Sequence, residues 1–267
     1  MVIVNSMVIK GGFMANIKIG IIGGSGMDDP CLMRNIKEKK VRTPYGSPSS
    51  HLTIGKIEGV DTVILARHGK DHSVYPTGVN FRANIFALKK EGCTHILATT
   101  AVGSLREKIK PGDLVFVDQF IDFTKHRALT FHDEKVIHTP MSEPFCNNLR
   151  SALVQRAKAL KLKHHGSGTV ITIEGPRFST KAESHMFRGF GADVINMSTV
   201  PEVILAREIG ICYQSIAMST DYDCWKEGEL PVTWEMIVAI MGKNADNVKK
   251  LIVMTIPKIM EIACNCK

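Results

Sequence analysis

The chain has 267 residues, of which 44% are hydrophobic and 22% are charged, with 22 glycines and 11 prolines. This composition is typical of an ordinary globular protein and excludes the fibrous and disordered classes. The 34 basic and 26 acidic residues give a formal net charge of +8. Because the basic residues are dispersed and are not interleaved with aromatic residues, we expect a small anionic substrate rather than a nucleic acid.

The elements predicted in chain order indicate an α/β fold, because β-branched apolar runs alternate with segments of helical periodicity. Strands are predicted over residues 17–23, 52–57, 62–66, 95–99, 114–120, 169–173, 194–197 and 211–219. Helices are predicted over residues 80–91, from Pro144, from the capping boxes Thr180 with Glu183 and Thr199 with Glu202, and from about Thr233. The last of these helices carries Trp234, Ile237, Val238, Met241 and Val248 on one apolar face. The basic run 37–40 is predicted to be a loop.

No repeat or Pro/Ser-rich linker divides the chain, so we predict one domain over residues 15–267, preceded by an extension over residues 1–14. The extension lacks the basic segment and cleavage site of a secretory signal, and no run of about 18 apolar residues follows that would span a membrane. Seven cysteines are scattered without the spacing of a disulfide framework or of a metal site, and Cys264 and Cys266 form an isolated CxC pair. We therefore expect free thiols, no bound metal, no membrane partner and a cytoplasmic or nuclear location.

A glycine turn, GIIGGSG over residues 20–26, ends the first predicted strand. Its backbone N–H groups and the hydroxyl of Ser25 are suited to hold a phosphate. The third glycine of a dinucleotide-binding turn would stand at Asp29, and no Gly-Lys-Ser/Thr follows, so neither a nicotinamide-dependent oxidoreductase nor a Walker loop is predicted. A tight structural turn explains the segment equally well.

Polar residues follow other predicted strands. Arg67 and His68 follow one strand, Thr100 follows another, and Ser198 stands just before a helix, where an N-terminus favours anions. Because open α/β sheets bind ligands at the carboxyl ends of their strands, a guanidinium fork and hydroxyls at these positions suit a tetrahedral oxyanion. A surface ion pair is the alternative for Arg67.

Two further segments are suited to hold a planar ligand. The turn EGPRFST leaves Phe178 and Ser179 at a helix entrance, although Phe178 as a hydrophobic staple is equally reasonable. Asp221 and Asp223 stand two residues apart on an extended chain and so point the same way. Because like charges raise one pKa, one acid is able to hold a proton and donate it to a leaving group. Two surface acids, or a weak Mg²⁺ site, are the alternatives.

Seven motifs follow one another along the chain: GIIGGSG, ARHG, ATTAVGSL, PGDLVFVDQFID, TIEGPRFST, GADVINMSTVPE and STDYDCW. Together they resemble the trimeric purine nucleoside phosphorylase family, most closely its 5′-methylthioadenosine phosphorylase branch, over residues 17–257. The resemblance implies a single-domain α/β fold around a mixed, distorted sheet flanked by helices. It also implies a homotrimer and the phosphorolysis of 5′-methylthioadenosine to adenine and 5-methylthioribose 1-phosphate. Inorganic phosphate is then a co-substrate, with no metal or organic cofactor.

The resemblance further implies roles for individual residues. The phosphate-binding positions match Ser25, Arg67, His68, Thr100, Ala101 and Ser198. The nucleoside-binding positions match Met197 at the ribose, Phe178 beside the purine, Asp221 and Asp223 facing the base, and His138 lent by a neighbouring subunit to the 5′ pocket. Ser179 and Trp234 are predicted to influence substrate specificity.

The resemblance implies a dissociative mechanism, in which bound phosphate captures an oxocarbenium-like ribosyl group and Asp221 or Asp223 protonates the departing purine. Branches that take 6-oxopurines carry Glu in place of Ser179 and Asn in place of Asp221, so adenine is favoured here. The alternatives are a phosphorylase of 6-oxopurine nucleosides or methylthioinosine, and a non-catalytic nucleoside-binding protein. Relatives usually continue past Pro257 into a helix that covers the 5′ pocket, so we expect a looser choice of 5′ substituent.

Overall fold

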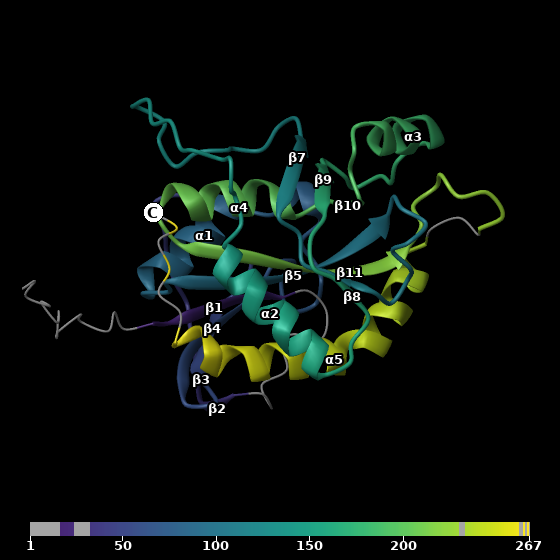
Figure 1. The fold of residues 1–267 in the computed structure, drawn as a ribbon. Helices are drawn as coiled ribbons and strands as arrows, with labels where there is room; N and C mark the ends of the chain where they lie inside the picture. The colour runs from purple at the N-terminus through teal and green to yellow at the C-terminus, as the bar shows by residue number, and fades with distance from the viewer. Residues whose placement is uncertain (1–16, 24–32, 230–232, 262–263, 265, 267) are drawn as a thin grey trace, which may run out of the picture.

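The computed structural model describes residues 17–23, 33–229, 233–261, 264 and 266. The predicted extension over residues 1–14 and the predicted phosphate ligand Ser25 lie outside the described residues. The described chain forms an 11-stranded mixed sheet with helices on both faces, which confirms the predicted fold class (Figure 1). None of the described helices is both long and apolar enough to cross a membrane.

The sheet runs in the order β2-β3-β4-β1-β5-β10-β9-β7, while β11 lies beside β5, β6 beside β11, and β8 beside β6. The strands are β1 (Ile19–Gly23), β2 (Arg34–Lys39), β3 (Leu52–Ile57), β4 (Val60–Ala66), β5 (His95–Ser104), β6 (Leu114–Val115), β7 (Gln119–Phe123), β8 (His164–His165), β9 (Thr169–Ile173), β10 (Val194–Asn196) and β11 (Cys212–Asp221).

Two strand predictions need correction. The run 114–120 is not one strand, because β6 pairs antiparallel with β11 whereas β7 pairs parallel with β9. The chain crosses between these partners at Asp118, whose Oδ1 accepts the N–H of Gly168 at 3.0 Å. The basic run 37–40, predicted to be a loop, lies mostly in β2, an exposed strand at the sheet edge that shows no hydrophobic period.

The helices are α1 (Phe81–Lys90), α2 (Asn147–Ala159), α3 (Lys181–Gly189), α4 (Thr199–Glu208) and α5 (Trp234–Ile259), with a short 3₁₀ helix at Pro76–Gly78. The capping box of Thr180 and Glu183 is confirmed at α3. The one predicted for Thr199 and Glu202 is wrong, because Ser198 occupies the N-cap of α4 without a side-chain cap. Glu202 instead forms a buried ion pair with Arg67.

Helices cover both faces of the sheet in pairs. Helices α1 and α4 pack together over one face and α2 and α5 over the other, each pair closing its own apolar core (Figure 1). Helix α3 covers a smaller cluster beside β9 and β10, built around the buried Phe187. The apolar face predicted for α5 buries Ile237, Met241 and Val248, whereas Trp234 and Val238 are exposed.

Strand β5 changes partners along its length, and this change opens the sheet. It pairs parallel with β1 as far as Ala98, and its last residues, Gly103 and Ser104, pair antiparallel with β10. Strand β11 follows β5 on the other side throughout. Among the described strands, β11 alone pairs with the intervening residues 99–102. Such a switch point is where α/β sheets commonly bind ligands.

Four of the seven cysteines, expected from the sequence to be scattered, lie together in the fold. The sulfur atoms of Cys146, Cys212, Cys264 and Cys266 all lie within 4.8 Å of one another. None of the described cysteines forms a disulfide. The sequence did not indicate their convergence, because their spacing along the chain matches no metal-ligand pattern.

Candidate active site

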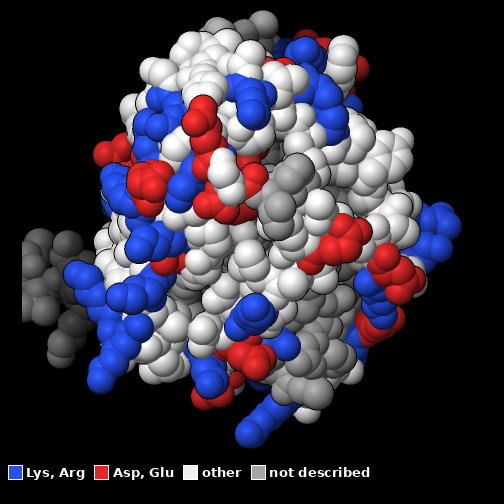
Figure 2. Space-filling view, turned by 90° about the vertical axis from the view of Figure 1, so that its right-hand side faces the viewer, with Lys and Arg blue, Asp and Glu red and all other residues white. Residues whose placement is uncertain are grey.

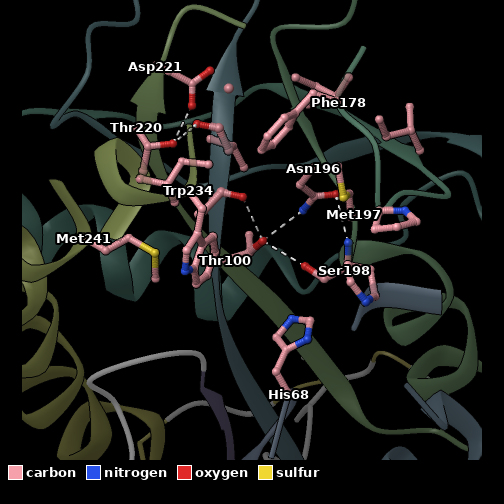
Figure 3. Close-up of a pocket in the computed structure, with 18 of the residues that line it drawn as sticks. His68, Thr100, Phe178, Asn196, Met197, Ser198, Thr220, Asp221, Trp234 and Met241 are labelled. Carbon is pink, nitrogen blue, oxygen red and sulfur yellow. Dashed lines mark hydrogen bonds between the residues drawn. The ribbon is translucent and has the colours of Figure 1, made fainter. Parts of the chain in front are cut away.

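A cavity of about 460 Å³ lies where β5 leaves β1 for β10 (Figure 3). Most of the predicted site residues line it, namely Arg67, His68, Thr100, Ala101, Phe178, Ser179, Met197, Ser198, Asp221, Asp223 and Trp234. His138 does not line the cavity of its own chain. It is exposed in the connection between β7 and α2, within the exposed run 133–138, and part of this connection projects from the body (Figure 1).

The hydroxyl groups of Thr100 and Ser198 lie 2.8 Å apart and border the cavity (Figure 3). The buried amide of Asn196 holds the first of them, since its Nδ2 donates to Oγ1 of Thr100 at 3.2 Å and also to Oγ1 of Thr199 at 2.6 Å. Its Oδ1 accepts the hydroxyl of Thr172 at 2.8 Å. The sequence analysis did not predict this role of Asn196. The signal available for it was the position of Asn196 at the end of β10.

The guanidinium of Arg67 is only 2% exposed and pairs with Glu202. Its Nε and Nη2 donate to the two carboxylate oxygens at 2.6 and 2.9 Å, and Nη1 donates to the carbonyl of Thr99 at 2.8 Å. The hydroxyl of Tyr213 donates to the same carboxylate at 2.8 Å, and burial raises the pKa of this tyrosine so that it stays a donor. The ion pair considered from the sequence therefore exists, but it is buried. Arg67 still borders the cavity, although Glu202 and the carbonyl of Thr99 already take three of its five N–H groups.

His68 faces the cavity as a neutral imidazole. Burial, together with the charge of Arg67, lowers the pKa of His68 to about 4. Its Nδ1 lies 2.8 Å from the carbonyl oxygen of Val74, which accepts the ring proton and leaves a lone pair on Nε2. Since Glu202 balances Arg67, this end of the cavity offers hydrogen-bonding groups with little net charge.

We expect His68→Gln to flatten the loss of stability on acidification. The folded pKa lies below the ordinary value of about 6.5, so unfolding takes up a proton and stability falls as the pH drops from about 6.5 toward 4. Allowing for partial solvent screening, His68 accounts for about 1–3 kcal/mol of that loss. Urea unfolding at a series of pH values measures it. Parallel curves for the variant and the parent would contradict a neutral folded His68.

Asp221 and Asp223 lie at the other end of the cavity, where β11 ends, and each is 8% exposed. One carboxylate oxygen of Asp221 accepts the backbone N–H of Asp223 at 2.7 Å, and the other accepts the hydroxyl of Thr220 at 2.7 Å (Figure 3). Burial raises the pKa of both carboxyl groups. They are therefore not the surface acids of the alternative interpretation, and either holds a proton more readily than an exposed acid.

Two glycines allow the chain to approach these side chains closely. A Cβ at Gly103 would stand 2.9 Å from Oδ1 of Asp221, so only glycine lets β5 pass the acids. Gly175 has a φ of +71°, and a Cβ there would stand 2.5 Å from the sulfur of Met197.

Phe178 and Ser179 border the same end of the cavity. The ring of Phe178 is 43% exposed and lines the cavity wall, so it does not act as a staple. The hydroxyl of Ser179 is buried and makes no hydrogen bond of normal length within the described part of the chain, but it lies near the carboxyl group of Asp223 and lowers the pKa of that group.

Helix α5 begins at the rim of the cavity. The ring of Trp234, 45% exposed, lies 4.7 Å from that of His72, which in turn lies 4.5 Å from His68. Ile237 and Met241 line the wall below. Sequence reasoning missed His72 and Met241 as site residues, because contacts between a strand end and a distant helix leave no local pattern.

The charges on the surface match the dispersed pattern of the sequence. Figure 2 shows one face of the molecule, on which Lys and Arg alternate with Asp and Glu rather than form one continuous basic area. The polar side chains that lie close together are instead those that line the cavity.

Comparison with known proteins shows that this chain is similar to enzymes. The Phosphorylase superfamily matches residues 18–257. The S-methyl-5′-thioadenosine phosphorylase of Xenopus tropicalis is 58% identical over 91% of this chain and 89% of its own, and that of Danio rerio is 55% identical over 93% and 91%. A solved structure of methylthioadenosine phosphorylase from Schistosoma mansoni in complex with adenine superposes with a TM-score of 0.89 at 43% identity, covering 92% of this chain and 93% of that one.

Proposed function

The chain belongs to the phosphorylase superfamily, and we propose that it cleaves 5′-methylthioadenosine with inorganic phosphate to give adenine and 5-methylthioribose 1-phosphate. The observation that carries this proposal is that one cavity holds two complementary ends. Hydroxyl groups and a guanidinium meet at one end, and two buried acids beside an aromatic ring meet at the other.

At the first end, Thr100, Ser198 and the backbone at Ala101 surround the phosphate, and Arg67 supplies a charged donor. The neutral Nε2 of His68 accepts a hydrogen bond from the O–H group of monohydrogen phosphate. The phosphate then stands beneath the ribose, where its charge stabilises an oxocarbenium-like transition state.

At the second end, Phe178 covers the purine and Met197 lies beside the ribose. A protonated Asp221 donates toward N7 of the leaving base, and Asp223 accepts from the 6-amino group. Burial raises the pKa of each acid, so each holds a proton more readily than an exposed aspartic acid does. The hydroxyl of Ser179 is small and leaves room at the edge of the base. It does not require a proton on N1 of the purine, so adenine is favoured over a 6-oxopurine.

We expect turnover of methylthioadenosine to require phosphate. Purified protein is incubated with the nucleoside, with and without phosphate, and the products are separated. Adenine and methylthioribose 1-phosphate should form only with phosphate, since the cavity supplies anion donors beside the base site. Adenine release at equal rates in both samples would indicate a hydrolase, and tight nucleoside binding without release would favour the non-catalytic alternative.

We also propose that the active form is a homotrimer in which His138 completes the 5′ pocket of a neighbouring subunit. In support, the segment that carries His138 projects from the body, and Val136 and Ile137 beside it are 83% and 44% exposed. Exposed apolar side chains at the tip of such a segment are typical of a contact surface.

Val136→Asp with Ile137→Asp should therefore dissociate the trimer and reduce activity, because it places two charges in the contact. Analytical ultracentrifugation of the parent should give the mass of three chains. Ile36→Asp, which changes an exposed residue of the edge strand β2, is the control. An active monomeric parent would refute the proposal.

A further inference from the structure

We propose that Cys146, Cys212, Cys264 and Cys266 bind one zinc ion, which fastens the C-terminal segment of the chain to its core. This cluster stands apart from the cavity, which none of the four residues lines. The proposal concerns a structural metal and does not alter the phosphorolysis described above.

All four sulfur atoms lie within 4.8 Å of one another and form one group rather than two separate pairs. Cys264 contacts all three others, with sulfur distances of 3.2 Å to Cys146, 2.9 Å to Cys212 and 2.9 Å to Cys266. A tetrahedral zinc with bonds of about 2.3 Å separates its sulfur ligands by about 3.8 Å. The ion would therefore move these atoms apart by less than about 1 Å. Two disulfides would also use all four sulfur atoms, but they would not require Cys264 to contact the three other cysteines at once.

Two ligands come from the rigid core and two from the chain end. Cys146 is the N-cap of α2 and Cys212 is the first residue of β11, and both are buried. Cys264 and Cys266 follow α5, and the carbonyl of Cys266 accepts a hydrogen bond from Arg207 of α4 at 3.0 Å. The chain end is thus already drawn against the core at the point where the four thiols meet.

His95 supplies an independent observation. It is 5% exposed, and its Nε2 has no hydrogen-bond partner in the described part of the chain. His95 is the register partner of Cys212 across β5 and β11, so the two side chains leave the sheet on the same face. A buried polar nitrogen without a partner is unfavourable, and metal-bound sulfur would give this one an acceptor.

Zinc binding exchanges one metal ion for the protons of the four thiols. One Zn²⁺ displaces four thiol protons and forms a tetrathiolate of charge −2, with no oxidation of sulfur. The adjacent guanidinium of Arg207 offsets part of that charge. Four thiolates around one ion form a closed structural site, because no coordination position remains for water or substrate.

The test is the zinc content of the full-length protein, purified with a phosphine reductant and without chelator, then dialysed against zinc and freed of excess metal. Plasma mass spectrometry should find one zinc per chain in the parent and in Cys93→Ala, which removes a buried cysteine outside the cluster. The double variant Cys264→Ser with Cys266→Ser should lose at least about nine-tenths of the metal, because two ligands cannot hold it. Removing zinc should lower the Tm of the parent but not that of the double variant.

Cobalt gives a second measurement that does not depend on folding stability. The parent loaded with Co²⁺ should show the thiolate charge-transfer band and the intense visible bands of a tetrahedral site, and the double variant should not. Metal below about one-tenth of an equivalent in the reduced parent would overturn the proposal. So would equal zinc in the double variant, or a disulfide among the four cysteines that persists under reduction and excludes the metal.

Discussion

Asp221→Asn should slow the release of adenine from methylthioadenosine by about 10²–10⁴-fold, the range of a positioned general acid. The change keeps the shape of the side chain and removes its transferable proton. Asp221 is buried, its amide oxygen in the variant can still accept the N–H of Asp223, and the hydroxyl of Thr220 can donate to Val102 and accept the new N–H, so the amide should occupy the same place. The loss should therefore appear in kcat and in kcat/KM together, as expected for an interaction made in the transition state.

The pH profile separates an acid role from a merely structural one. Activity of the parent should fall as the pH rises through the raised pKa of the acid, because the proton is then lost. The Asn variant should lack that alkaline limb. Asp61→Asn, at an exposed acid that pairs with Lys56, is the matched control and should leave both rate and profile unchanged.

A second substitution tests the choice of base. Adding Ser179→Glu to Asp221→Asn supplies an acceptor for the N1–H of a 6-oxopurine, at a position that borders the cavity beside Asp223. The ratio of kcat/KM for inosine to that for methylthioadenosine should rise, even if both values are low. If Asp221→Asn alone turns over as fast as the parent, the acid role passes to Asp223, and the same series is repeated there.

The parts of the site that lie at strand ends could be predicted from the sequence. Apolar runs revealed the strands, and Arg67 and Asp221 then fell at their carboxyl ends, whereas Thr100, predicted to follow a strand, lies within β5; all three border the cavity. Their assignment to phosphate and base came from the resemblance of the motifs. Composition and periodicity alone left a surface ion pair and two surface acids open, and burial in the structure is what separates these alternatives.

The predictions that were wrong or missing concern residues whose partners lie far away in the chain. The T-x-x-E pattern predicted Glu202 as a capping residue, but pairing with Arg67 in the core overrides that local preference. The edge strand β2 carries no apolar period because both its faces meet solvent. The cysteine cluster joins α2, β11 and the segment after α5, which only the tertiary fold brings together.

Removing the charge of Arg67 should have the second large effect, and it should be twofold. Arg67→Met leaves Glu202, which is fully buried, with the hydroxyl of Tyr213 as its main remaining donor. An uncompensated buried carboxylate of this kind costs about 3–5 kcal/mol of folding free energy. The lost charged hydrogen bonds to phosphate, about 1.5–3 kcal/mol, should raise the KM for phosphate by about 10–150-fold.

The double variant Arg67→Met with Glu202→Gln separates these two effects. Replacing Glu202 removes the buried charge that Arg67→Met leaves behind, so urea unfolding should show that much of the stability returns. The KM for phosphate should stay high, because no guanidinium remains at the cavity wall. The single variant Glu202→Gln keeps the guanidinium of Arg67 and removes the carboxylate that neutralises it. The KM of this variant for phosphate should therefore be no higher than that of the parent. If the double variant regains both stability and phosphate affinity, Arg67 acts only through the ion pair, and the hydroxyls of Thr100 and Ser198 bind the anion without it.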